Sequence, residues 1–104
     1  MSLDEEASAR RREMQALHRQ QLDADIRAVM ETQAGRRVVW WLLDGVAGLH
    51  GPSFAGEATA TAYNEGRRSV GIDVMQAVQR LTKPAYLLMV EERMRALSIE
   101  SPDT

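Results

Sequence analysis

The chain of 104 residues contains few side chains that could do chemistry, and their spacing predicts no catalytic site. His18 lies among polar residues with no acidic partner at metal-ligand spacing, so a surface position is expected. His50 lies in a predicted loop and could act as a general base only beside a nucleophile. Glu91 and Glu92 are adjacent on a predicted helix, so their side chains diverge. We therefore expect no catalytic residue, no cofactor and no metal ion.

Two arginine pairs are better suited to binding than to catalysis. The sequence Gly35-Arg36-Arg37 recurs as Gly66-Arg67-Arg68, with a valine two residues after each pair. Paired guanidinium groups can clamp phosphate or carboxylate groups through parallel hydrogen bonds. The alternative is that acids on the same helix, Glu65 and Asp73, neutralise the second pair in surface ion pairs that contribute about 0–1 kcal/mol each.

Six consecutive apolar residues follow the first arginine pair and raise the question of what covers them. On a helix turning about 100° per residue, one side becomes an aliphatic stripe that we expect to face the core, with the members Val38, Val39, Leu42, Leu43, Val46 and Leu49. The opposite side carries a mixed aromatic and charged face formed by Arg37, Trp40, Trp41 and Asp44.

The mixed face has three interpretations. The first or last helix of the same chain could cover it, with each indole N–H bonded locally. It could instead be an exposed contact surface for another protein, because Trp and Arg dominate interface hot spots. A stacking platform for single-stranded nucleic acid is the third interpretation, which the net charge of −2 and Asp44 both oppose.

The periodicity of apolar residues predicts an all-α fold, a small bundle of four to five helices with an extended N-terminal helical arm. Ser2 and Glu5 form a capping box for the arm helix, residues 3–20, which has few apolar residues. Thr32 is expected to cap the helix that carries the tryptophans, which would run to about Ala47. The remaining helix starts are predicted at Asp23 or Asp25, at Thr59 or Thr61, and near Pro84.

The two later helices each show an apolar stripe that is expected to pack in the core. In the long helix the stripe is Tyr63, Val70, Val74, Ala77 and Leu81, opposite the polar residues Ser69, Asp73, Gln76 and Arg80. In the last helix it is Tyr86, Leu87, Val90, Met94 and Leu97. Because a glycine inside a helix costs about 1 kcal/mol relative to alanine, Gly66 and Gly71 are expected where helices approach closely.

The domain organisation and composition limit the class of protein. We expect an arm over residues 1–20, a helical core domain over residues 21–98 and a loose tail over residues 99–104. The net charge of −2 disfavours nucleic-acid binding by charge alone. The lack of cysteine excludes disulfides, and the apolar run that ends at Leu49 is too short to span a bilayer. The first residues have acids before bases and no apolar run, so we expect neither a secretory signal nor a transit peptide.

Three blocks, in order, carry a resemblance to a known family. The first runs from Gly35 to Leu43, and the second joins Ser53-Phe54 to Glu65-Gly66-Arg67-Arg68-Ser69-Val70-Gly71. The third contains Pro84, Tyr86, Leu87, Leu88 and Met89. Over about residues 23–93, the chain resembles small helical proteins encoded among the virion-structure genes of short-tailed bacteriophages (podoviruses), first met in a Bordetella phage. Trp41 stands where that pattern has a polar or basic residue, and His50 where an aromatic is common.

The resemblance implies a phage origin and a role in the virion or its assembly. Our hypothesis is a non-enzymatic protein that contacts other virion proteins, in the virion or in the host cytoplasm during assembly, with an interaction surface of Arg36, Arg37, Trp40, Trp41, Asp44, Arg67 and Arg68. The same surface would also suit a homo-oligomer. The alternative is a nucleic-acid-associated packaging or ejection factor, with the paired arginines on phosphates. No membrane partner is expected.

Overall fold

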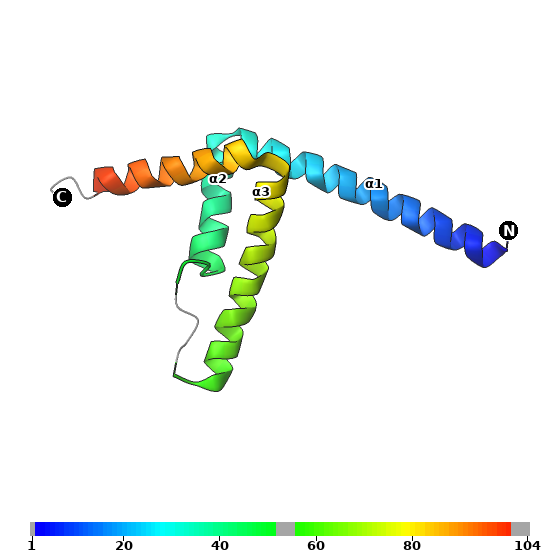
Figure 1. Ribbon diagram of the computed structural model, residues 1–104, viewed down its shortest axis with the longest axis horizontal. Helices are drawn as coiled ribbons and strands as arrows, with labels where there is room; N and C mark the ends of the chain where they lie inside the picture. Colours follow the sequence, from blue (N-terminus) through cyan, green and yellow to red (C-terminus); the bar gives the residue numbers. More distant parts are fainter. Residues whose placement is uncertain (1, 52–55, 101–104) are drawn as a thin grey trace.

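The protein is an elongated helical molecule shaped like the letter T (Figure 1). The computed structural model describes residues 2–51 and 56–100. These form α1 (Leu3–Glu31), α2 (Gln33–Trp40), the π-helix η1 (Trp41–Val46) and α3 (Ala58–Glu100). The all-α prediction is confirmed for this part of the chain. The predicted bundle of four to five helices is replaced by three α-helices and one π-helix, in a more open arrangement.

The N-terminal helix is longer than predicted. The Ser2 side chain accepts from the Glu5 N–H and the Glu5 carboxylate accepts from the Ser2 N–H, which confirms the capping box. The predicted break near Gln20 is wrong, because α1 continues without interruption to Glu31. Between Leu3 and Glu31 there is neither glycine nor proline. An aspartate in mid-helix costs less than about 1 kcal/mol, so aspartates alone do not end the helix.

The second helix begins where the sequence indicated. Thr32 has extended backbone angles, and its hydroxyl accepts from the Gly35 N–H at 2.9 Å. The helix then widens into η1, where the Ala47 N–H donates to the Leu42 carbonyl at 2.8 Å, five residues back. Gly48, with a φ of 65°, ends the segment in the left-handed conformation that glycine adopts easily.

The third helix is bent in its middle. It begins at Ala58, earlier than the predicted Thr59 or Thr61, and Thr82 has non-helical angles (φ −153°, ψ 58°). Pro84 follows, and proline disturbs a helix because it lacks an N–H and its ring clashes with the preceding turn. We call residues 58–81 the proximal part of α3 and residues 83–100 the distal part. Helix continues to Glu100, so the first two residues of the predicted loose tail are helical.

The arrangement of these elements explains the shape. In Figure 1, α1 and the distal part of α3 point in opposite directions and form the crossbar of the T. The stem consists of α2 and η1 beside the proximal part of α3. Ser53 and Phe54, which belong to the second block of the resemblance, lie outside the described residues. Over residues 2–51 and 56–100, none of the helices has the continuous apolar length that a transmembrane span requires.

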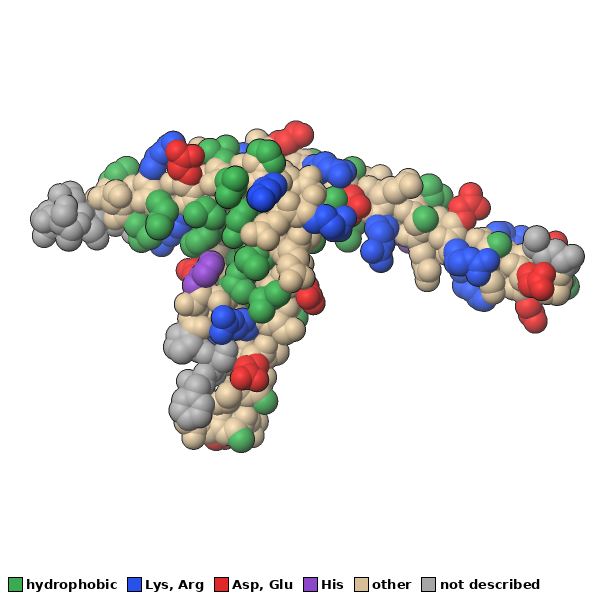
Figure 2. All heavy atoms as spheres, in the orientation of Figure 1, with side chains coloured by type: hydrophobic (Ala, Val, Ile, Leu, Met, Phe, Trp, Pro, Cys, Tyr) green, Lys and Arg blue, Asp and Glu red, His purple; other side chains and the backbone are tan. Residues whose placement is uncertain are grey.

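The core lies where the stem meets the crossbar and draws residues from every element. Its buried members are Met30, Val39, Leu43, Leu49, Val78 and Met89. Figure 2 shows apolar side chains gathered at this junction, whereas the outer part of α1 carries mainly charged ones. The shortest principal extent is only 16 Å, about the depth of two packed helices. The described part of the chain therefore has two broad faces that no third layer of its own helices covers.

The predicted apolar stripes are only partly buried for this reason. In the stripe of α2 and η1, Val39, Leu43 and Leu49 are buried, but Val38, Leu42 and Val46 are exposed. The proximal part of α3 buries Gly71 and Val78, while Tyr63, Val70 and Val74 of the predicted stripe are exposed. The distal part buries Met89 and leaves Leu87, Met94 and Leu97 exposed. These core predictions were wrong because one neighbouring helix covers a narrower face than a complete bundle does.

Candidate protein-binding groove

A groove lies in the angle between α2–η1 and the distal part of α3. Its volume is about 520 Å³, within the usual range of ligand-binding sites. The wall formed by α2 and η1 contains Gln33, Arg37, Trp40, Trp41, Asp44 and Gly45, and the wall formed by α3 contains Met89, Arg93 and Ala96. Arg36 and Glu92 line it as well. We call this the tryptophan groove.

Helical spacing explains why these residues share the groove. On each wall, every lining residue has another lining residue three or four positions away, so each set lies on one side of its helix. These positions are 33, 37, 40, 41 and 44 on one wall and 89, 92, 93 and 96 on the other. The structure thereby brings together five of the seven residues that the sequence nominated: Arg36, Arg37, Trp40, Trp41 and Asp44. Arg67 and Arg68 do not line the groove.

The two tryptophans have different environments. The Trp41 side chain is 60% exposed, and it lies over Gly45, where a Cβ would come within 3.1 Å of the indole Cδ1. Trp40 is half-buried, and its ring stacks on the His50 ring with centroids 5.4 Å apart. The buried Trp40 Nε1 has no hydrogen-bond partner among the described residues. Its own chain therefore covers this face only in part, because Trp40 packs against the core whereas Trp41 stays exposed.

The charged residues of the groove divide into paired and free groups. Asp44 Oδ1 lies 3.3 Å from His50 Nδ1, so His50 contacts both Trp40 and Asp44. Arg37 is exposed, and Arg93 lies on the opposite wall. With Arg36 and Glu92 neutralising each other, the two guanidinium groups of Arg37 and Arg93 outweigh the carboxylate of Asp44. The open part of the groove therefore combines indole surface with a small excess of positive charge.

Arg36, which the sequence also suggested as a contact residue, is one of the buried residues of the junction. It is 8% exposed, and its Nε and Nη2 donate to the two carboxylate oxygens of Glu92 at 2.7 and 3.1 Å. Its Nη1 donates to the Met30 carbonyl at 2.9 Å, near the end of α1. The hydrogen bonds from Arg36 lower the pKa of Glu92 and outweigh the opposing effect of burial. Arg36 thus joins α1, α2 and α3 and holds the two walls of the groove together.

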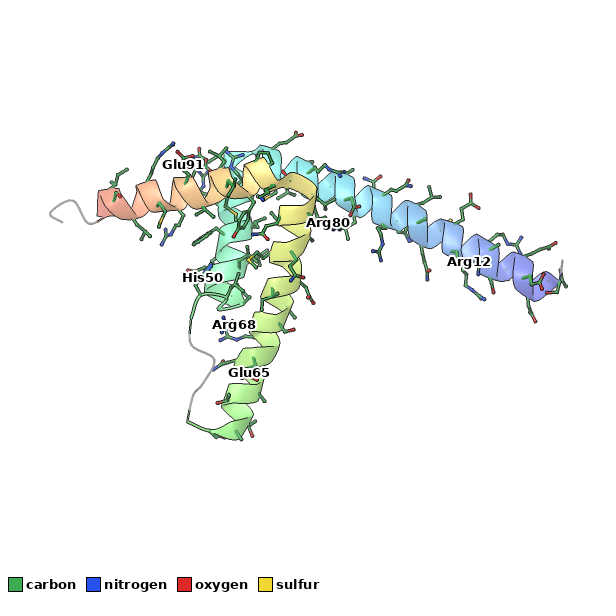
Figure 3. All side chains as sticks on the ribbon, viewed as in Figure 1. Arg12, His50, Glu65, Arg68, Arg80 and Glu91 are labelled. Carbon is green, nitrogen blue, oxygen red and sulfur yellow. The ribbon has the colours of Figure 1, made fainter. Side chains whose placement is uncertain are left out.

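The two arginines of the second pair, Arg67 and Arg68, also have different environments. Arg67 Nη1 donates to the Val46 carbonyl at 2.9 Å, Nη2 donates to Asn64 Oδ1 at 3.0 Å, and the guanidinium lies 5.3 Å from the Tyr63 ring centroid. Arg68 is exposed. Figure 3 shows Arg68 and His50 on the stem, whereas Glu91 lies beyond the bend of α3. In each pair the first arginine stabilises the fold and only the second faces solvent.

Sequence reasoning missed the α3 wall of the groove, formed by Met89, Glu92, Arg93 and Ala96. Glu92 lies 56 residues from Arg36, and no local spacing relates two residues that far apart. No group of three or more His, Cys, Asp or Glu side chains in the described chain could hold a metal ion. The groove thus offers apolar contact and a small excess of positive charge to a ligand.

The match to a known protein family covers the part of the chain that forms the stem, the junction and the groove. The model of the Bbp19-like phage proteins matches residues 26–92, which spans the stem, the junction and both walls of the groove up to Glu92. This chain belongs to the Bbp19-like phage protein family. The resemblance to a phage protein family that the sequence blocks indicated is confirmed. Most of α1 lies outside the matched residues. No curated protein and no solved structure matches the chain.

Proposed function

We propose that this Bbp19-like protein is a non-enzymatic component of the phage particle or of its assembly intermediate, and that it binds another particle protein through the tryptophan groove. The exposed Trp41 beside Arg37 is the observation that carries this proposal. Large aromatic and arginine side chains contribute most of the binding energy at protein interfaces. The solvent-exposed indole of Trp41 on the wall of the groove has surface to bury, and no described residue covers it fully.

The groove also indicates the chemistry of the partner segment. Its walls meet at an angle, and the exposed Trp41 and the half-buried Trp40 present apolar surface, with Arg37 and Arg93 at the sides. An amphipathic helix fits such a groove, because its apolar face can fill the space while its polar face stays in solvent. The partner segment should carry a carboxylate near its apolar residues, for pairing with Arg37 or Arg93.

The nucleic-acid alternative finds less support in the arrangement of the arginines. A phosphate clamp needs two free guanidinium groups side by side, but Arg36 is engaged by Glu92 and Arg67 by Val46 and Asn64. Only Arg37 and Arg68 remain exposed, one from each pair. Two separated arginines on a chain of net charge −2 give little sequence-independent affinity for DNA.

The test is quantitative mass spectrometry of immature and mature particles of the phage whose genome encodes the chain. Wild-type protein should be present in one or both, and Trp41→Ala should weaken its binding about 30-fold, which is the loss of about 2 kcal/mol expected for one hot-spot residue. Because Trp41 is 60% exposed, the variant should keep its fold, which circular dichroism checks.

Val38→Ala is the matched control for this experiment. Val38 is an exposed apolar residue on the same helix, and it does not line the groove, so the variant should enter particles at the wild-type level. Absence of the wild-type protein from both kinds of particle would contradict the proposed role. Equal incorporation of the Trp41→Ala variant and the wild-type protein would contradict the assignment of the groove.

A further inference from the structure

A second groove lies between α1 and the proximal part of α3, and its lining is almost entirely apolar. Its volume is about 510 Å³. The lining residues are Leu22, Asp25, Ile26, Val29, Met30, Val39, Asp73, Val74, Ala77 and Val78. We call it the aliphatic groove. It shares no lining residue with the tryptophan groove, so the two surfaces can be tested separately.

The apolar walls of this groove are open to solvent. Val29 is 44% exposed on the α1 wall, and Val74 is 39% exposed on the α3 wall. Val74 belongs to a helical stripe of α3 that the sequence pattern marks as core, yet the described chain leaves more than a third of its surface open. Such a stripe is typical of a helix face that is buried against another helix. Over the described residues, the groove is therefore a core-like surface that its own chain covers only in part.

The total exposed area shows how much surface is left uncovered. The chain exposes 7802 Å², whereas a compact monomer of 11.6 kDa exposes about 5800 Å². The radius of gyration is 18.7 Å, compared with about 13 Å for a compact domain of 100 residues. The excess of roughly 2000 Å² per chain is spread over the extended helices, and it lies within the range that one subunit of an obligate homodimer can bury.

We propose that the aliphatic groove is covered by the same groove of a second copy of this chain, in a symmetric dimer. A two-fold axis brings one patch onto its own duplicate, so a single uncovered groove on each chain supplies both sides of the interface. The apolar walls would form the interface centre, and Asp25 and Asp73 would lie in its polar rim, as charged residues do at stable interfaces. This proposal is independent of the partner assigned to the tryptophan groove.

Sedimentation equilibrium of the full chain tests the proposal. Wild-type protein at about 100 µM, well above a micromolar Kd, should have twice the monomer mass. Val74→Asp places a carboxylate at the interface centre and should raise the dimer Kd at least about 30-fold, which corresponds to one hot-spot residue. Val29→Asp, on the opposite wall, should have the same effect. If one variant loses its helical circular dichroism, the other still decides the outcome.

Ile99→Asp is the matched control. Ile99 is 77% exposed near the end of α3 and does not line the aliphatic groove, so its variant should remain dimeric. A monomeric wild-type chain at about 100 µM would overturn the proposal, since a Kd above that value is too weak for an obligate interface. Folded Val74→Asp and Val29→Asp variants that remain dimeric would also overturn it, as would dissociation of the Ile99→Asp variant.

Discussion

Arg36 and Arg37 are adjacent in the sequence and have opposite roles in the structure. One residue corresponds to a rotation of about 100° around a helix, so the two side chains leave α2 in different directions. Arg36 enters the junction and binds Glu92 and the Met30 carbonyl, whereas Arg37 stays exposed on the wall of the tryptophan groove. A pattern of two arginines therefore does not by itself indicate a site for two guanidinium groups.

The Glu92→Gln variant tests whether the Arg36–Glu92 pair holds the groove together. Because the bond with Arg36 lowers the Glu92 pKa below its usual 4.5, the pair stabilises the fold above about pH 4.5. This stabilisation is lost as the pH falls through the lowered pKa. The variant should have a lower Tm than wild type at pH 7, and the difference should shrink as the pH is lowered from 4.5 through the lowered pKa of Glu92. Thermal unfolding followed by circular dichroism at several pH values measures this.

Glu91→Gln is the control for that experiment. Glu91 pairs with Arg95 on the same helix, and both side chains are exposed, so the pair contributes little to the stability of the fold. Its Tm should stay close to that of wild type at every pH. Equal losses of Tm in the Glu91→Gln and Glu92→Gln variants would show that the partly buried pair has no special role.

At the scale of the elements, the stem depends on a close approach of η1 and α3. A Cβ added at Gly71 would lie 2.7 Å from the Ala47 Cβ, a distance that real Cβ atoms do not adopt. The residue after Ala47 is the left-handed Gly48, and the Val46 carbonyl before it accepts a hydrogen bond from Arg67. The end of η1 is thus fixed against α3 by a packing contact and by one charged hydrogen bond.

The Gly71→Ala and Gly66→Ala variants should change stability in opposite directions. Both replacements gain about 1 kcal/mol of helix propensity. At Gly71 the new methyl group forces η1 and α3 apart, an overpacking that costs about 1–3 kcal/mol and outweighs the gain. At Gly66 nothing lies within 4 Å of the new atom, so the gain remains. Urea unfolding of the two variants measures the difference, and a stabilised Gly71→Ala variant would contradict the close approach.

The helix ends could be predicted from sequence to the extent that local chemistry fixes them. Ser2 and Thr32 cap their helices as expected, and the bend of α3 lies next to Pro84. Of the two glycines expected at close helix contacts, Gly71 meets Ala47, whereas a Cβ at Gly66 would meet nothing. The π-helix could not be predicted, because backbone hydrogen bonds that span five residues leave no distinct pattern of residue types in the sequence. Most of the groove's α2–η1 wall was predicted, but its α3 wall depends on a contact between distant segments.

At the scale of the whole molecule, most of the described residues are helical, but the helices bury only part of one another's apolar faces. Most of the buried apolar side chains are concentrated at one junction, while both ends of the crossbar extend away from it (Figure 1). Apolar stripes that would fill the core of a compact bundle line two separate grooves and two broad faces instead. Sequence patterns could identify these stripes as apolar but could not identify their partners, because the apolar pattern is the same whether another chain or the same chain covers it.

Native-state hydrogen exchange should distinguish the arm from the junction. Residues 9–20 of α1 are all exposed, and an isolated helix of about 12–15 residues is only marginally stable in water. Their amides should therefore exchange much faster than those of Leu43 and Val78, which open only when the core at the junction unfolds. In the proposed dimer, protection should begin near Leu22, where α1 enters the aliphatic groove. Strong protection of residues 9–20 would contradict this, because it would show that another molecule also covers the outer part of the arm.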